Sequence, residues 1–327
     1  MSRLRSVARA VVAVASTTAT ELCGQPAVLL LLLAGTVLTA LVPLLHFHDF
    51  GEPGRICRDS GLAYQLVIGT VVSVVAASAS IHDEIVGGTA LAALGKPISR
   101  EVFLVGKWLG VMSVASRFWY CTLAAFLVAW RVPQRFADLG EEGMKYVTDS
   151  ASQSALLALP AIALALAGFM HNRRKVRFCK TAISCMTALS TMLLAACLLF
   201  DRTWRLAPSV SNIDIAAVPV SVLVLMALAV YSAFAAALST RLAAPPVLAT
   251  CLVLIAAGLS WDAISSVSPF LAAMPVPNLQ SFWMCDAIAG GGRLGTEYFE
   301  LALAYSAASV AVALGAGMLL FRGRDLG

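Results

Sequence analysis

The sequence is poor in charge and in the residue patterns that serve hydrolytic and metal chemistry. Only 13% of its 327 residues are charged, and it contains four histidines. It has no HExxH, GxSxG or CxxC pattern and no paired aspartates within its apolar segments. These absences argue against metalloprotease and serine-hydrolase chemistry. We therefore expect a protein that is not an enzyme, with no catalytic residue and no cofactor or metal of its own.

Apolar residues are what the sequence has in excess. They make up 60% of the chain, and the mean hydropathy is +0.85. They gather in runs of about 20 residues, which as helices cover roughly 30 Å of hydrocarbon. Since lipid forces each span to satisfy its own backbone, we expect an all-α, polytopic transmembrane helical bundle. The eight predicted spans are Pro26–Leu45, Leu62–Ile81, Val102–Trp130, Ala151–Met170, Thr181–Phe200, Ile215–Leu238, Val247–Ser265 and Phe299–Phe321.

The distribution of charge predicts the orientation of these spans. An even number of spans puts both termini on one side. The segments on that side hold 14 of the 23 bases but only 5 of the 18 acids. By the positive-inside rule both termini are cytosolic. The net charge of +5 then reports topology, and we expect no nucleic-acid partner.

Residues 1–24 predict an amphipathic helix that lies in the membrane interface. Val7, Val11 and Val14 share one helical face, and Arg5 and Arg9 share the opposite one. Such a helix contacts the lipid bilayer with its apolar face. The alternative is a frayed terminal tail.

Three features of the predicted loops remain open. His46, His48 and Asp49 could hold a metal, but such a cluster is also a common cap at the end of a span. Cys57 and Cys285 lie in predicted outer loops, the second within the long loop 266–298, and could form a disulfide. The basic run at 171–180 is a topology anchor, or it contacts a lipid headgroup or a partner.

Arg117 is a charge within the predicted third span. An arginine at the centre of a span costs about 2.5–3.5 kcal/mol on insertion scales. It lines a cavity or substrate path, or pairs with an acid, for which Asp262 in the seventh span is the best candidate. The alternative is that the span is offset and Arg117 reaches the interface.

The polar insert at 82–100, between the second and third spans, predicts a short helix in the cytosol. Gly87 and Gly88 end the preceding helix, because glycine costs about 1 kcal/mol relative to alanine in a helix. Thr89 is a suitable N-cap for a short helix over Ala90–Leu94. Pro97 prevents its continuation. A merely structural loop is the alternative.

The surroundings of this short helix are also informative. Leu91 and Leu94 form an apolar stripe between charged neighbours that include Glu84, Lys96 and Arg100. The stretch from Gly88 to Lys96 does not match the phosphate-loop pattern, since Ala90 stands where a glycine is needed. We expect no ATP site in this chain.

This string of residues resembles the signature of the ABC-2 type permeases, the membrane subunits of a class of ABC transporters. The family pattern is an acid, then Gly–Thr, Lys–Pro, Ser–Arg and Gly–Lys. Pro277–Asn278–Leu279 and the end of the chain also resemble the family. The matching residues are Glu84, Gly88, Thr89, Lys96, Pro97, Ser99, Arg100, Gly106, Lys107 and Gly110.

The resemblance implies a function and a set of partners. Residues 25–327 would form the permease domain, as a homodimer or heterodimer in a bacterial cytoplasmic (inner) membrane. Separate ABC ATPase subunits would bind ATP and Mg and drive the movement of an unknown substrate, and we expect export because members of this family mostly export. Eight spans are typical of the copper-enzyme maturation permease subgroup, whereas many members have six. The residues expected to couple to the ATPase are Glu84, Gly88, Thr89, Leu91, Leu94, Lys96, Pro97, Arg100, Gly106 and Lys107.

Two other functions fit the composition. An ion-coupled secondary carrier would have broken helices and paired charges at mid-membrane. A non-transporting membrane scaffold or assembly factor would need neither feature.

Overall fold

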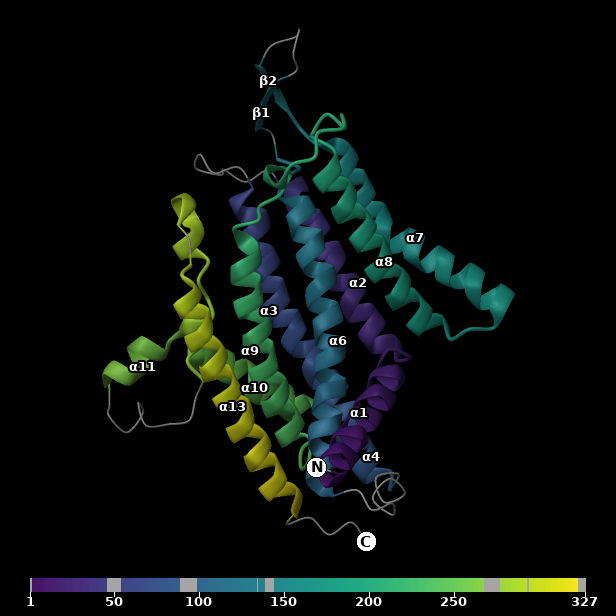
Figure 1. Ribbon diagram of the computed structural model, residues 1–327, viewed down its shortest axis with the longest axis vertical. Helices are drawn as coiled ribbons and strands as arrows, with labels where there is room; N and C mark the ends of the chain where they lie inside the picture. Colours follow the sequence, from purple (N-terminus) through teal and green to yellow (C-terminus); the bar gives the residue numbers. More distant parts are fainter. Residues whose placement is uncertain are drawn as a thin grey trace. The chain divides into compact units, whose positions relative to one another are not determined.

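The computed structural model describes residues 2–45, 54–88, 99–133, 135–138, 144–267, 277–292 and 294–322. The chain is a polytopic membrane protein, and the predicted all-α helical bundle is confirmed (Figure 1). Within the described residues, seven helical segments are long and apolar enough to cross a membrane. They are Pro26–Leu44, Arg55–Val86, Arg100–Ala129, Ser150–Arg174, Phe178–Leu199, Ala217–Leu238 and Thr296–Arg322.

The chain divides into two compact units. The first consists of Met1–Leu22, Gly69–Ser116 and Val222–Gly327, and the second of Cys23–Ile68 and Arg117–Ser221. Three helices contribute residues to both units: α3 (Arg55–Ala77), α6 (Arg100–Ala129) and α9 (Ala217–Leu238).

The first unit is built on the beginning of α6. A π-helical turn, η2 (Ser78–His82), continues α3 into the short helix α4 (Asp83–Val86). Helix α13 (Thr296–Arg322) ends beside the start of α6. The core of this unit consists of apolar side chains from these elements and from α9. Its members are Ile81, Ile85, Phe103, Leu104, Ala233, Ala236, Ala313, Leu314 and Phe321.

The predicted N-terminal helix is present as α1 (Ser2–Leu22). It packs on α6 through two glycines. A Cβ added to Gly106 would lie 2.7 Å from Cβ of Val14, and one added to Gly110 would lie 2.6 Å from Cβ of Thr18. Small residues four apart allow helices to approach this closely. The face of α1 expected to contact lipid thus partly faces protein.

The predicted seventh span is interrupted. Helix α10 (Ala244–Leu259) ends with Ser260 as its C-cap and is followed by the short helix α11 (Trp261–Val267). At 16 residues α10 is about 24 Å long, shorter than the hydrocarbon core. The chain then returns to α10, where a Cβ on Gly258 would lie 2.6 Å from the carbonyl oxygen of Pro277. The Gln280 amide donates to the Leu259 carbonyl over 2.9 Å, which satisfies one carbonyl at the end of α10.

The returning segment then follows the first half of α13. It contains two 3₁₀ turns, η5 (Leu279–Ser281) and η6 (Asp286–Gly291). Tyr305 accepts from the backbone N–H of Asn278, and Tyr298 donates to the Ser281 carbonyl. Backbone that is not helical can lie beside a span only where such partners replace water. This stretch of the predicted outer loop is therefore packed against a helix.

The second unit contains α2 (Pro26–Leu41) with its 3₁₀ extension η1 (Val42–Leu44), α7 (Ser150–Arg174) and α8 (Phe178–Leu199). Helices α7 and α8 are antiparallel neighbours. Asp149 caps α7 by accepting from the Ser152 N–H. Lys175 ends the helix in the left-handed conformation. The Gln153 amide donates to the Ala40 carbonyl over 2.8 Å and connects α7 to α2.

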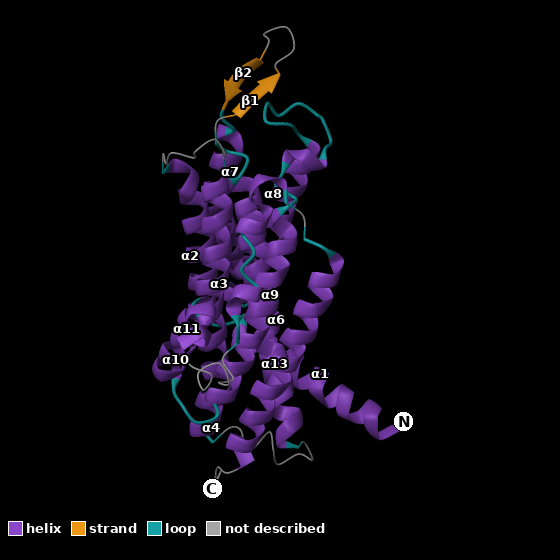
Figure 2. Cartoon of the chain, turned by 90° about the vertical axis from the view of Figure 1, so that its left-hand side faces the viewer, coloured by secondary structure: helices purple, strands orange, loops and turns teal. Residues whose placement is uncertain are grey.

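A small sheet precedes α7, where the sequence indicated only a polar connection. Strands β1 (Arg135–Asp138) and β2 (Met144–Val147) pair antiparallel, with Arg135 opposite Val147 (Figure 2). After α8, a 3₁₀ turn, η4 (Val210–Asn212), leads toward α9. Cys57 is buried in the second unit and Cys285 in the first, and their pairing stays a prediction.

Candidate functional site

The predicted coupling segment is only partly within the described residues. Thr89, Leu91, Leu94, Lys96 and Pro97 lie outside them, as do the metal candidates His46, His48 and Asp49. Glu84, Gly88, Arg100, Gly106 and Lys107 are described and all belong to the first unit. The candidate site is therefore the framework that holds the two ends of residues 89–98.

The first end is the end of α4. As the sequence predicts, the helix stops at Val86, with Gly87 as its C-cap and Gly88 at a φ of +72°. Glycine adopts this left-handed conformation without the clash that a Cβ would cause. The π-helical turn η2 comes directly before α4. π-Helical turns are rare in proteins overall, but those that occur are often found at functional sites.

Glu84 of α4 forms an ion pair with Lys107 of α6. Lys107 Nζ donates to Glu84 Oε1. The Lys107 side chain is 6% exposed and that of Glu84 is 25% exposed. Lys107 also lies 5.4 Å from the centroid of the Phe103 ring. Removing one partner from a buried pair is costly, because the remaining charge loses its compensation. This pair therefore fixes the end of α4 on α6.

The second end is the start of α6. The Ser99 hydroxyl accepts from the Val102 N–H over 3.3 Å and so caps the first turn of α6. Arg100 donates to the carbonyls of Phe321 and Arg322 over 3.0 and 3.1 Å, and its guanidinium lies 5.4 Å from the Phe321 ring centroid. The last carbonyls of a helix have no partner within it, so a cation is favourable there. Arg322 in turn pairs with Glu101.

Gly106 has a role that the family resemblance does not supply. Together with Gly110 it forms the surface of α6 on which α1 packs. A displacement of the first turns of α6 would therefore meet α1 as well as α4 and α13. The described residues of the signature thus connect four helix segments: α1, α4, α6 and α13.

A scan against protein-family models gives no match for this chain. Searches of curated proteins and of solved structures give no match either. The resemblance to the ABC-2 type permeases therefore rests on the signature residues of the sequence and stays a prediction.

Arg117 lies close to the beginning of α2. Burial raises the pKa of the Cys23 thiol, and the positive charges of Arg117 and Lys180 partly offset this effect. Cys23 is three residues before Pro26, the first residue of α2, so the two positive charges and the thiol gather near one end of that span. Arg117 is exposed. This placement favours the interpretation in which Arg117 reaches the membrane interface.

Asp262 does not lie within a membrane-length helix. It is an exposed residue in the first turn of α11. The predicted partnership between Asp262 and Arg117 joins residues of different units and stays a prediction.

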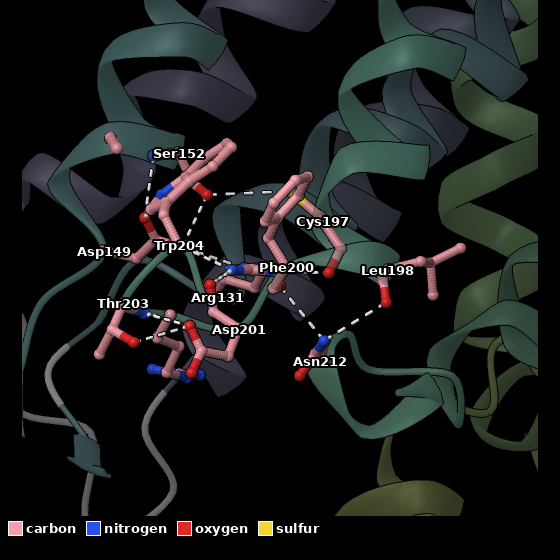
Figure 3. Close-up of polar contacts among 12 residues, drawn as sticks. Arg131, Asp149, Ser152, Cys197, Leu198, Phe200, Asp201, Thr203, Trp204 and Asn212 are labelled. Atoms are coloured by element: carbon pink, nitrogen blue, oxygen red, sulfur yellow. Dashed lines mark hydrogen bonds and ion pairs between the residues drawn. The ribbon is translucent and has the colours of Figure 1, made fainter. Parts of the chain in front are cut away.

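Sequence reasoning missed a buried charge cluster at the other end of α6. Arg131 and Asp149 are both fully buried and form an ion pair with 3.0 Å between nitrogen and oxygen (Figure 3). Arg131 also donates to the backbone carbonyls of Cys197, Phe200 and Asp201. One guanidinium therefore holds the start of α7 and the end of α8.

The surrounding groups complete this cluster. Asp149 accepts from Ser152 and from the Trp204 indole over 3.1 Å, and the Trp204 ring stacks on Phe200 (Figure 3). Nearby, Asp201 accepts from the N–H groups of Thr203 and Arg205. Burial alone would raise the pKa of the Asp201 carboxyl. These hydrogen bonds and the Arg205 charge outweigh burial and lower the pKa.

Proposed function

We propose that this chain is the membrane subunit of an ABC-2 type transporter. A separate ATPase that binds ATP and Mg would dock on residues 89–98 and drive movement of a substrate, in the direction of export. The observation that supports this function most is that polar contacts hold both ends of that segment to neighbouring helices. Glu84 and Lys107 fix one end to α6, and Arg100 fixes the other to α13.

The bracing suits the transmission of force. A segment held by flexible chain at both ends would absorb a push from a partner. A segment held by a buried ion pair and by hydrogen bonds to a helix end instead transfers displacement to those helices, because packed elements shift as rigid bodies. A conformational change in the ATPase would therefore displace α4, α6 and α13 together.

The proposal includes an orientation and an assembly. Residues 89–98 and both termini would be cytosolic, in a bacterial cytoplasmic membrane, as the distribution of bases and acids indicates. Two such permeases, identical or different, would work with two ATPase subunits.

Site-specific cross-linking tests the proposal. A photoreactive amino acid at Leu91 is expected to link the tagged chain, in its native membrane, to an ATPase that carries the phosphate-loop motif. The matched control places the same residue at Ser209, an exposed position beside η4. Absence of such an ATPase among the products, or equal linking from both positions, would overturn the proposal.

Charge reversal tests the coupling itself. Glu84→Lys should uncouple ATP hydrolysis from transport, since two cations then face each other at a nearly buried site. The double variant Glu84→Lys/Lys107→Glu should recover much of the coupling because the pair is restored. The control is Glu297→Gln, an exposed acid in the first turn of α13. Equal transport in Glu84→Lys and the unaltered protein would refute the role of the pair.

The interrupted seventh span favours a second candidate, an ion-coupled secondary carrier. Carriers often form their sites at discontinuous helices. Helix α10 ends at Leu259, and the chain folds back onto it. Transport in sealed vesicles separates the two functions. Uptake driven by an ion gradient without ATP or a partner ATPase would favour the carrier.

A further inference from the structure

The α7–α8 hairpin carries the whole net charge of the protein at its turn. Residues 150–200 contain five bases and no acid, and the rest of the chain has equal numbers of each. We refer to these five bases as the basic tip: Arg173, Arg174, Lys175, Arg177 and Lys180. All five are exposed.

Two aromatic side chains flank the basic tip. Phe169 is 60% exposed and Phe178 is 36% exposed. The Arg173 guanidinium lies 5.4 Å from the Phe169 ring centroid, and His171 contacts the edge of Phe178. Exposed aromatics next to bases at the end of a span are typical of the level of the lipid headgroups. The tip therefore marks the membrane surface on this hairpin.

An apolar groove runs between the same two helices further from the tip. It has a volume of about 260 Å³. Its lining residues are Ala155, Leu159, Ile162, Leu189, Met192 and Leu193. Ile162 and Met192, at 47% and 67% exposed, leave the groove open to the outside. No charged side chain lines it.

The spacing of the tip and groove fits one lipid molecule. The lining residues nearest the tip are Ile162, 11 residues before Arg173, and Leu189, nine residues after Lys180. They are therefore about 13–17 Å from the tip along the helices. Half of the hydrocarbon thickness is about 15 Å. A lipid with its headgroup at the tip would thus place the distal part of an acyl chain in the groove.

We propose that the α7–α8 hairpin is a binding site for an anionic phospholipid, with the headgroup at the basic tip and an acyl chain in the groove. The excess of five bases over acids selects an anionic headgroup. It also disfavours a second copy of this chain as the occupant, because a symmetric contact would bring two such tips together. The hairpin is shown in teal in Figure 1.

Native mass spectrometry of the delipidated, full-length protein tests the headgroup contact. Phosphatidylglycerol is titrated against phosphatidylcholine with the same acyl chains. We expect the unaltered protein to retain phosphatidylglycerol preferentially. Each base near an anionic surface contributes roughly a fivefold change in affinity. The triple variant Arg173→Gln/Arg174→Gln/Lys175→Gln should therefore lose up to about a hundredfold.

The matched control removes the same charge from another element. Arg3→Gln/Arg5→Gln/Arg9→Gln takes three bases from α1. This control is expected to change phosphatidylglycerol retention by less than about fivefold. Equal losses in the two triple variants would show attraction by net charge alone and would overturn the site. Loss of a co-purifying protein with unchanged lipid retention would overturn it in favour of a protein contact.

A groove variant tests the acyl-chain contact without altering any charge. Ile162→Trp should obstruct the end of the groove nearer the tip and weaken the binding of long-chain phosphatidylglycerol by about tenfold, roughly the loss of two buried methylene groups. Binding of a short-chain phosphatidylglycerol that cannot reach 13 Å from the tip should not change. Leu157→Trp, at an exposed position outside the lining, is the control. An equal effect of Ile162→Trp on both lipids, or none on either, would refute the proposed pose.

Discussion

The buried pair of Arg131 and Asp149 allows the sharpest prediction about stability. Arg131→Met removes a guanidinium that is fully buried and that serves one carboxylate and three carbonyls. Among the described residues, the buried Asp149 charge then keeps Ser152 and Trp204 as its donors. Breaking a buried pair by removing one partner costs about 3–5 kcal/mol. We expect a loss of this size in the free energy of unfolding.

A double-mutant cycle separates the pair from its surroundings. Asp149→Leu alone should also cost about 3–5 kcal/mol, since it leaves Arg131 uncompensated. Arg131→Met/Asp149→Leu should cost at least 2 kcal/mol less than the sum of the two single changes, roughly the upper part of the range for coupled neighbours. The free energies are measured by reversible unfolding in mixed micelles of detergent and SDS.

The control for this cycle is Arg205→Met, an exposed base close to the same cluster. It should stay within about 0.5 kcal/mol of the unaltered protein. If Arg131→Met costs less than about 1 kcal/mol, or if the two single changes add without coupling, the pair does not hold α7 and α8 as we infer.

Two further predictions concern the first unit and the loop after α8. Gly110→Leu should destabilise the packing of α1 by about 1–3 kcal/mol, because its side chain would overlap Thr18. Amide exchange of α1 measures this loss. The control is Gly315→Leu, at a position where an added Cβ would meet no described atom within 4 Å outside its own stretch of helix. Equal exchange in both variants would refute the close contact. The pKa of Asp201 is lower in the folded state than its unfolded value of about 3.8. Asp201 therefore stabilises the folded state at pH values above 3.8, and this contribution is lost as the pH falls through the folded-state pKa. Asp201→Asn should therefore flatten the dependence of unfolding on pH below about 4, and an unchanged acid dependence would contradict the assignment.

Local features of the candidate site could be predicted from the sequence because they depend on neighbouring residues. Gly87 and Gly88 end α4, and Ser99 caps α6, since capping and helix breaking act within one turn. The selection of Glu84, Arg100 and Lys107 came from the family resemblance. Their partners did not, because Arg100 donates to residues more than 200 positions away.

Features that depend on distant contacts could not be predicted. The seventh span has the composition of a complete span, yet α10 stops where residues 277–280 fold back onto Gly258 and Leu259. Arg131 has the sequence context of an ordinary base after a span. Its complete burial depends on the end of α8, which supplies the carbonyls around it.

The sequence by itself determined that this is a bundle of apolar helices, because a chain in lipid must satisfy its backbone within each span. It also determined where α4 ends, through Gly87 and Gly88. The tertiary structure decided which charges meet: Glu84 with Lys107, Arg100 with the end of α13, and Arg131 with Asp149. These pairings follow from packing between segments far apart in the chain, and no local pattern of residues encodes them.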